Sequence, residues 1–137
     1  MDALVKNIVV EIDKPKLYAE VDQTKNVLLY RWKGHILDDE ATDGFSELLA
    51  IIKKREINNV IADISQFKGG TVKIAKWVNE EYSEMLKSAN VQKMAIIVPE
   101  SAFGEFSNTV ALGQKFVSLI QVEKFSALQD AHNWFEK

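Results

Sequence analysis

The side chains that could do chemistry in this sequence lie near the end of one predicted central strand. Asp63 and Ser65 stand two residues apart where the apolar run NNVIADI ends, and Gly69, Gly70 and Thr71 follow just before a helical pattern begins. A carboxylate in that position lies at the edge where open α/β sheets bind ligands. It could equally bond the amides around Ser65, so a binding role and a structural role both stay open for Asp63.

The glycine pair at 69–70 also allows two interpretations. Backbone amides at a helix start can meet an anion or a partner, with Thr71 as a hydroxyl open to modification. The competing interpretation is a flexible turn followed by a helix N-cap. The loop 66–71 does not match the G-x-x-x-x-G-K-[ST] pattern of a phosphate-binding loop.

Aromatic residues and a further serine extend this candidate surface. Ser101 and Phe103 follow the apolar run 93–98 and are expected to line the same sheet edge. Trp77 is expected on the exposed flank of the preceding helix, because an aromatic ring among charges is typical of partner surfaces. Core packing is the alternative for these rings, including Phe67.

The residue types argue against catalysis and against bound metals. The chain has no cysteine and only two histidines, His35 and His132, which excludes thiolate chemistry and Cys-ligated metal sites. The acidic cluster at 38–43 lacks the spacing of a calcium loop and reads as helix capping, with Asp38 as the N-cap. We find no nucleophile–base pair, so we expect no enzyme, no cofactor and no metal.

Composition narrows the class of protein. The 137 residues are 47% hydrophobic, and 17 basic residues against 20 acidic ones give a net charge of −3. This length predicts a single domain over residues 1–137. A mildly acidic chain lacks the basic field that nucleic-acid binding needs. No apolar run approaches the roughly 20 residues of a membrane span, and no signal-peptide pattern is present, so we expect a cytoplasmic protein.

Apolar periodicity predicts the elements that must position these residues. An N-terminal antiparallel hairpin is followed by alternating helices and strands, and helical crossovers impose parallel pairing. Ser126 and Gln129 match a capping box at the last helix. The fold class is therefore α/β, with a mixed, mostly parallel sheet of five to six strands and four helices. The expected strands are 7–12, 17–22, 26–33, 58–64, 93–98 and 117–122, and the expected helices are 38–54, 71–88, 105–116 and 126–135.

Four segments also carry a family resemblance: YRWKG at 30–34, VIADIS at 60–65, WV at 77–78 and AIIVPESAFG at 95–104. With these segments the chain resembles the stand-alone, SpoIIAA-like group of anti-sigma-factor antagonists in the STAS-domain superfamily, over residues 25–137.

The resemblance implies a regulatory domain that binds a protein partner. In the classical antagonists a Ser or Thr at the start of the helix after the central strand is phosphorylated, which changes partner binding. The corresponding hydroxyl here would be Thr71. The sequence departs from the family's Asp-Ser-Ser/Thr-Gly text, because it has KGGT at 68–71.

Two functions follow as expectations. The first is a protein-interaction module that docks a partner, or a second copy of itself, through the surface 66–77 and the loop 99–103. The second is a carrier of a small apolar ligand, which the lipid-transfer-like branch of the same group implies. Its cavity would lie between sheet and helices and be lined by Trp32, Phe67, Trp77 and Phe103.

Overall fold

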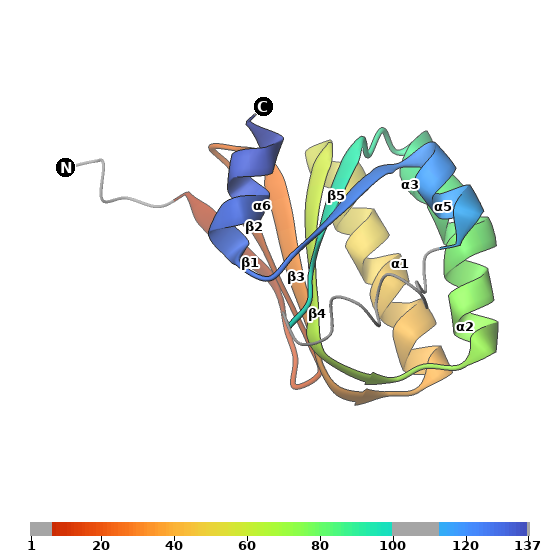
Figure 1. The fold of residues 1–137 in the computed structure, drawn as a ribbon. Coiled ribbons are helices and arrows are strands. Elements are labelled where there is room, and N and C mark those ends of the chain that lie inside the picture. Colours follow the sequence, from red (N-terminus) through yellow and green to blue (C-terminus); the bar gives the residue numbers. More distant parts are fainter. Residues whose placement is uncertain (1–6, 100–112, 137) are drawn as a thin grey trace.

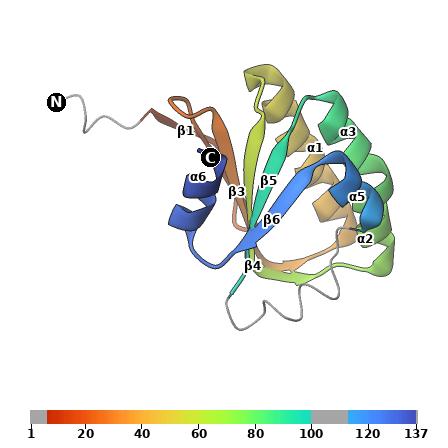
Figure 2. The same ribbon diagram turned by 45° about the horizontal axis from the view of Figure 1, so that its top comes forward.

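The computed structural model describes residues 7–99 and 113–136. Its centre is one six-stranded sheet in the order β1-β2-β3-β4-β5-β6 (Figures 1 and 2). The first three strands pair antiparallel, and β3, β4, β5 and β6 pair parallel. The expected mixed α/β sheet with an antiparallel N-terminal hairpin is confirmed. The strands are β1 (Ile8–Asp13), β2 (Leu17–Asp22), β3 (Val27–Ile36), β4 (Asn59–Gly69), β5 (Lys93–Ile97) and β6 (Gln121–Phe125).

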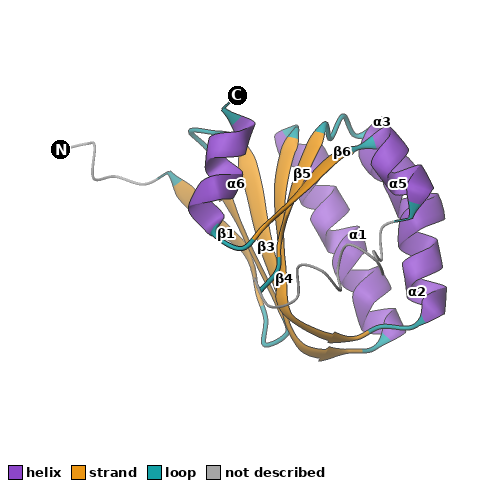
Figure 3. Cartoon of the chain, in the orientation of Figure 1, coloured by secondary structure: helices purple, strands orange, loops and turns teal. Residues whose placement is uncertain are grey.

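Helices cover both faces of this sheet (Figure 3). We call the side under the larger group of helices the cavity face, and the opposite side, under α6 (Leu128–Phe135), the α6 face. Successive strand residues point to opposite faces, so Tyr30 and Trp32 of β3 join the core on the cavity face while Leu29 joins the core under α6. The cavity-face helices are α1 (Asp38–Arg55), α2 (Val72–Trp77), the π-helical segment η2 (Val78–Tyr82), α3 (Ser83–Ser88) and α5 (Gln114–Leu119).

β3 and β4 run further than their side chains predict. The expected strand ended at residue 64, with a loop over 66–70, but β4 continues to Gly69 and stays paired with β3 as far as Ile36. The extension has no apolar alternation, and parallel backbone pairing holds it instead. A bulge precedes it: Arg31 pairs with Asp63 and Lys33 with Gln66, so β4 has one extra residue there.

Two further expectations at the C-terminal end are wrong. The strand expected over 117–122 is instead the end of α5 followed by β6, because Phe116 and Ile120 are buried four residues apart, as a helical turn places them. The final helix has Ala127 as its N-cap with no side-chain cap bond, so the Ser126 capping box does not form. The helix expected over 105–116 lies mostly outside the described residues.

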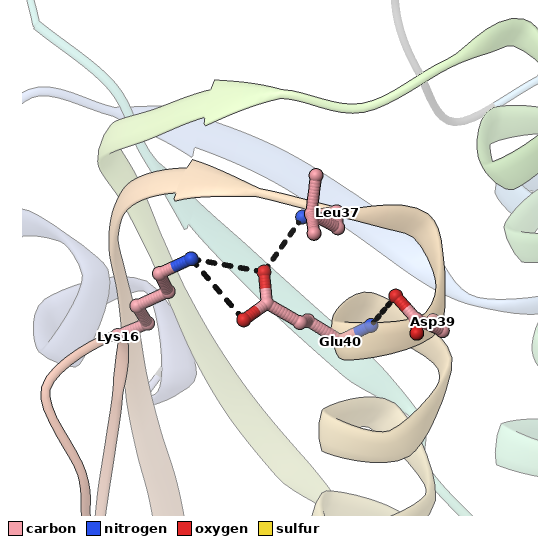
Figure 4. A network of polar contacts seen from close by, with 4 residues as sticks. All are labelled: Lys16, Leu37, Asp39 and Glu40. Atoms are coloured by element: carbon pink, nitrogen blue, oxygen red, sulfur yellow. Dashed lines mark hydrogen bonds and ion pairs between the residues drawn. The ribbon is translucent and has the colours of Figure 1, made fainter.

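The N-terminus of α1 is held by a polar network rather than by the expected Asp38 cap (Figure 4). The N-cap residue is Leu37, whose backbone N–H donates to Oε1 of Glu40 at 2.9 Å. Lys16 Nζ, from the loop between β1 and β2, donates to the same carboxylate at 2.9 and 3.1 Å. The Leu37 N–H and then Lys16 lower the pKa of Glu40. The network therefore joins the hairpin to the start of α1.

Of the described residues, none belongs to a helix long and apolar enough to cross a membrane. The cytoplasmic location stays a prediction.

Candidate functional site

An apolar cavity of about 340 Å³ lies between the cavity face of the sheet and the helices above it. Its walls come from the strands β3, β4 and β5, from the helices α1, α2, η2 and α5, and from the turn before α2. This volume falls within the range of small-molecule sites, roughly 300–1,000 Å³. The described lining residues are Tyr30, Trp32, Phe45, Ala62, Ile64, Phe67, Gly69, Gly70, Thr71, Val72, Ile74, Ala75, Val78, Tyr82, Met94, Ile96 and Phe116.

The turn from β4 into α2 forms one end of the cavity. Gly69 and Gly70 have φ of +89° and +83°, in the left-handed region that favours glycine. A Cβ at Gly70 would also lie 3.3 Å from the Phe67 ring. Thr71 is the N-cap of α2: its Oγ1 accepts from the Ile74 N–H at 3.4 Å and donates to Asp38 Oδ2 at 2.6 Å. The glycine–threonine turn thus starts α2 and ties it to α1.

The helix that forms the opposite wall contains a π turn. The sequence predicts one helix over 71–88, and the structure divides it into α2, η2 and α3. A π turn inserts one residue into the helical repeat and occurs often at functional sites. Tyr82 closes this turn and is 2% exposed, whereas Met85, expected in the same apolar stripe, is 39% exposed. Leu86, four residues after Tyr82, is fully buried, so the face that packs on the sheet continues beyond the π turn.

Several aromatic rings pack against one another in and behind the cavity walls. The Phe45 ring lies 4.8 Å from Tyr82 and 5.4 Å from Trp32, measured between centroids. Phe67 meets the other side of Trp32 edge-on at 6.1 Å. Trp77 stacks on Tyr82 at 5.4 Å but does not line the cavity. Of the four rings expected to line a cavity, Trp32 and Phe67 do so, and Phe103 lies outside the described residues.

The expected exposed flank around Trp77 is not observed. Trp77 is half-buried behind Tyr82, and Ile74 is 7% exposed because the first turn of α2 faces the cavity. The large apolar side chains exposed near this end are Val72, 86% exposed, and Leu37, 53% exposed. They flank the hydrogen bond between Thr71 and Asp38.

Asp63 and Ser65 lie away from the cavity, although the sequence places them in the same candidate site. Asp63 Oδ1 accepts from the Ser65 N–H at 3.1 Å and from its hydroxyl at 2.6 Å. Asp63 Oδ2 accepts from Arg31 Nε at 3.0 Å. Because Ala62 and Ile64 line the cavity, the alternation of the strand turns Asp63 toward the α6 face. These bonds fix the bulge of β4.

The candidate residues are therefore divided by the sheet. Phe67, Gly69, Gly70 and Thr71 line the cavity, and Trp77 lies behind its wall. Ser101 and Phe103 lie outside the described residues.

Two lining residues that sequence reasoning missed are Tyr30 and Tyr82. Each stands in an apolar stripe, where a tyrosine looks like ordinary core, so only the position of its hydroxyl could have marked it. Burial raises the pKa of Tyr30, and burial followed by the neighbouring Tyr30 raises the pKa of Tyr82. Both phenols are therefore protonated at neutral pH.

The described residues that line the cavity carry no charged side chain. No lining residue that the structure describes is Asp, Glu, Lys, Arg or His. In the described ranges, no group of three or more His, Asp or Glu side chains could hold a metal ion. The arrangement is suited to enclosing an apolar molecule.

Comparisons with known proteins identify the fold. No family model matches the sequence, and no curated protein is significantly similar to it. Among solved structures, the chain resembles an uncharacterized protein of the DUF3478 family from Shewanella loihica PV-4, described as having a SpoIIAA-like fold. The TM-score is 0.55 and the identity 14%, over 98% of each chain. The SpoIIAA-like fold that the sequence resemblance implied is confirmed.

Proposed function

We propose that this SpoIIAA-like domain binds a small, largely apolar molecule in the cavity between its sheet and its helices. The observation that carries the proposal is the cavity itself: about 340 Å³, bounded by aromatic and aliphatic side chains and without a charged group in its described lining. Ligand sites are typically concave, mostly apolar and largely formed before binding.

The walls support binding without large rearrangement. Trp32 is 2% exposed and packs against both Phe45 and Phe67, so the surrounding core already holds its ring. A binding site that is ordered in advance loses little side-chain entropy when the ligand enters. The driving force is then removal of apolar surface from water, at about 25 cal/mol per Å².

The proposed activity is binding rather than catalysis. The hydroxyl groups of the described lining belong to Thr71, Tyr30 and Tyr82. Thr71 already bonds Asp38 and the Ile74 amide. The described lining contains no histidine and no carboxylate that could act as a base. A binding protein needs none of these groups.

Cavity-filling substitution tests the proposal. We expect wild-type protein to bind the neutral dye N-phenyl-1-naphthylamine in a saturable one-to-one manner, measured by its fluorescence. Ala75→Leu places new carbons in the cavity, because Ala75 lines it, and should weaken binding by about tenfold or more. The matched control is Ala50→Leu, on the exposed side of α1, which should bind as wild type does. Absence of saturable binding, or equal loss in both variants, contradicts the proposal.

Protein docking is the second candidate function, and one observation favours it. Val72, which lines the cavity, and Leu37 are exposed apolar side chains on either side of the Thr71–Asp38 bond. A protein partner or a second copy of the chain could cover them. Phosphate on Thr71 would remove its hydroxyl proton and set a negative group against the Asp38 carboxylate, which would separate the ends of α1 and α2.

Native mass spectrometry of protein purified from its own source distinguishes the two candidates. A retained small molecule supports ligand binding. A dimer, or a mass increase of one phosphate, supports the docking function.

A further inference from the structure

Two almost completely buried tyrosines line the proposed ligand cavity, one in the sheet and one in the helical wall. Tyr30 belongs to β3, in the floor formed by the sheet, and Tyr82 closes the π turn in the helical wall. The two residues are 4% and 2% exposed. Each phenol is therefore held by surrounding core while its residue borders the cavity.

The hydrogen bonds of the described residues leave both hydroxyls without a partner. The buried polar side-chain atoms that are sealed from solvent space and unpartnered are Trp32 Nε1, Asp38 Oδ1 and His132 Nδ1. The hydroxyls of Tyr30 and Tyr82 are not among these sealed atoms, so each retains contact with open space. Both residues line the cavity and are almost completely buried, so the cavity is the open space nearest to them.

The cost of a buried, unpartnered hydroxyl favours a ligand that bonds to it. A buried hydroxyl without a partner costs about 1–3 kcal/mol, and buried tyrosine hydroxyls usually find one. Without a ligand that bonds them, two such hydroxyls in one apolar cavity lower the stability of the fold, and phenylalanine at either position would avoid that loss. A phenol is protonated at neutral pH even at its ordinary pKa, and burial raises the pKa of both tyrosines further, so each offers a hydrogen-bond donor.

We propose that the ligand is an uncharged apolar molecule with a carbonyl oxygen, which accepts hydrogen bonds from the hydroxyls of Tyr30 and Tyr82. This inference rests on the proposed ligand-binding function. A carbonyl oxygen has two lone pairs and no proton, so it can accept from both phenols. A carboxylate does not fit, because a buried charge needs a partner of opposite sign and the described lining holds no cationic side chain.

Paired probes test the inference. Benzophenone and diphenylmethane have nearly the same shape and differ by a carbonyl in place of a methylene. Their affinities are measured by displacement of N-phenyl-1-naphthylamine from wild type, Tyr30→Phe and Tyr82→Phe. Each substitution keeps the ring and removes one donor. We expect each to weaken benzophenone binding by about 3- to 10-fold and to leave diphenylmethane binding unchanged or slightly tighter.

Tyr18→Phe is the matched control, because Tyr18 lies on β2 and already donates to Glu20; it should change neither affinity. If both probes bind and the phenylalanine variants shift neither, or shift both equally, the carbonyl inference is overturned while the proposed function stands. Tighter binding of diphenylmethanol than of benzophenone also overturns it. If neither probe displaces the dye and the dye itself does not bind, both proposals are overturned.

Discussion

The two faces of the sheet differ in how the polar groups of β3 are bonded, and three consecutive residues show the difference. Tyr30 and Trp32 point to the cavity face, where no described residue bonds the phenol hydroxyl or the indole N–H. Arg31, between them, points to the α6 face and donates to Asp63 at 3.0 Å. The same strand thus supplies unpaired groups to one side and paired groups to the other.

The paired groups of the α6 face form a continuous network. The Tyr18 hydroxyl donates to Glu20 at 2.7 Å, and the Arg31 guanidinium lies 5.9 Å from the centre of the Tyr18 ring. Asp63 links Arg31 to Ser65, which fixes the bulge in β4. On the α6 face these bonds fix the shape of the sheet, whereas the unpaired Tyr30 belongs to the wall of the space where we place a ligand.

The largest expected difference between the faces is their tolerance of added volume. Ala95 is completely buried under α6, in one cluster with Ala131, whereas Ala62 borders the cavity. We expect Ala95→Leu to lower the free energy of unfolding by about 1–3 kcal/mol through overpacking. Ala62→Leu should cost less than about 1 kcal/mol, because its new carbons enter open volume. Urea denaturation measures both, and equal losses would show that the cavity cannot accept these carbons.

Removal of a polar group should cost more stability on the α6 face, where the group is bonded, than on the cavity face, where it is not. Asp63→Ala removes the acceptor for Arg31 and Ser65 and should lower the free energy of unfolding by about 1–2 kcal/mol. Ser65→Ala removes one donor and should cost less. Tyr30→Phe removes a buried hydroxyl with no described partner, so we expect the free energy of unfolding to stay unchanged or to rise, by up to about 1–3 kcal/mol. Thermal and urea denaturation of the three variants provide the comparison; a loss in Tyr30→Phe as large as in Asp63→Ala would contradict it.

The smallest expected difference is in tyrosine ionisation. The hydrogen bond to Glu20, followed by burial, raises the pKa of Tyr18 to about 12, whereas burial alone raises that of Tyr30. Because the folded pKa of Tyr18 lies above the ordinary value of 10.0, its contribution to stability is complete below pH 10 and is lost as the pH rises through 12.

Absorbance of phenolate near 295 nm tests this difference. We expect Tyr18 to titrate reversibly near pH 12, and Tyr30 and Tyr82 to ionise only as the protein unfolds. Tyr18→Phe should abolish the reversible step. A reversible step that persists in this variant would show that a cavity tyrosine ionises in the folded protein.

Much of the fold could be predicted from the sequence where side chains alone set the pattern. The strand over 17–22 was predicted with its observed bounds, because Leu17, Ala19 and Val21 alternate with polar residues. The extension of β4 to Gly69 could not be predicted from the sequence, because backbone pairing with β3 stabilises it and its own side chains do not. The π turn gave no signal either, because apolar spacing alone fits a regular helix.

The candidate site could be predicted only in part. The sequence placed four residues near the strand end in the candidate site, and all four line the cavity: Phe67, Gly69, Gly70 and Thr71. Asp63 and Ser65 were placed with them because they are close in sequence, but the alternation of β4 puts the Asp63 carboxylate on the other face. Tyr30 and Tyr82 come from distant segments, and their hydroxyls become notable only once the surrounding bonds are known.

The π turn at Val78–Tyr82 has a consequence for how relatives of this protein could diverge. Its extra residue corresponds to one codon, and deletion of that codon would leave a regular α-helix. If the residue lost were Tyr82 itself, Ser83 would follow Glu81 directly, and a serine hydroxyl would take the sequence position from which the phenol now borders the cavity. A single in-frame deletion could therefore exchange the polar group that the cavity offers while the sheet, the bulge and the aromatic walls stay as they are.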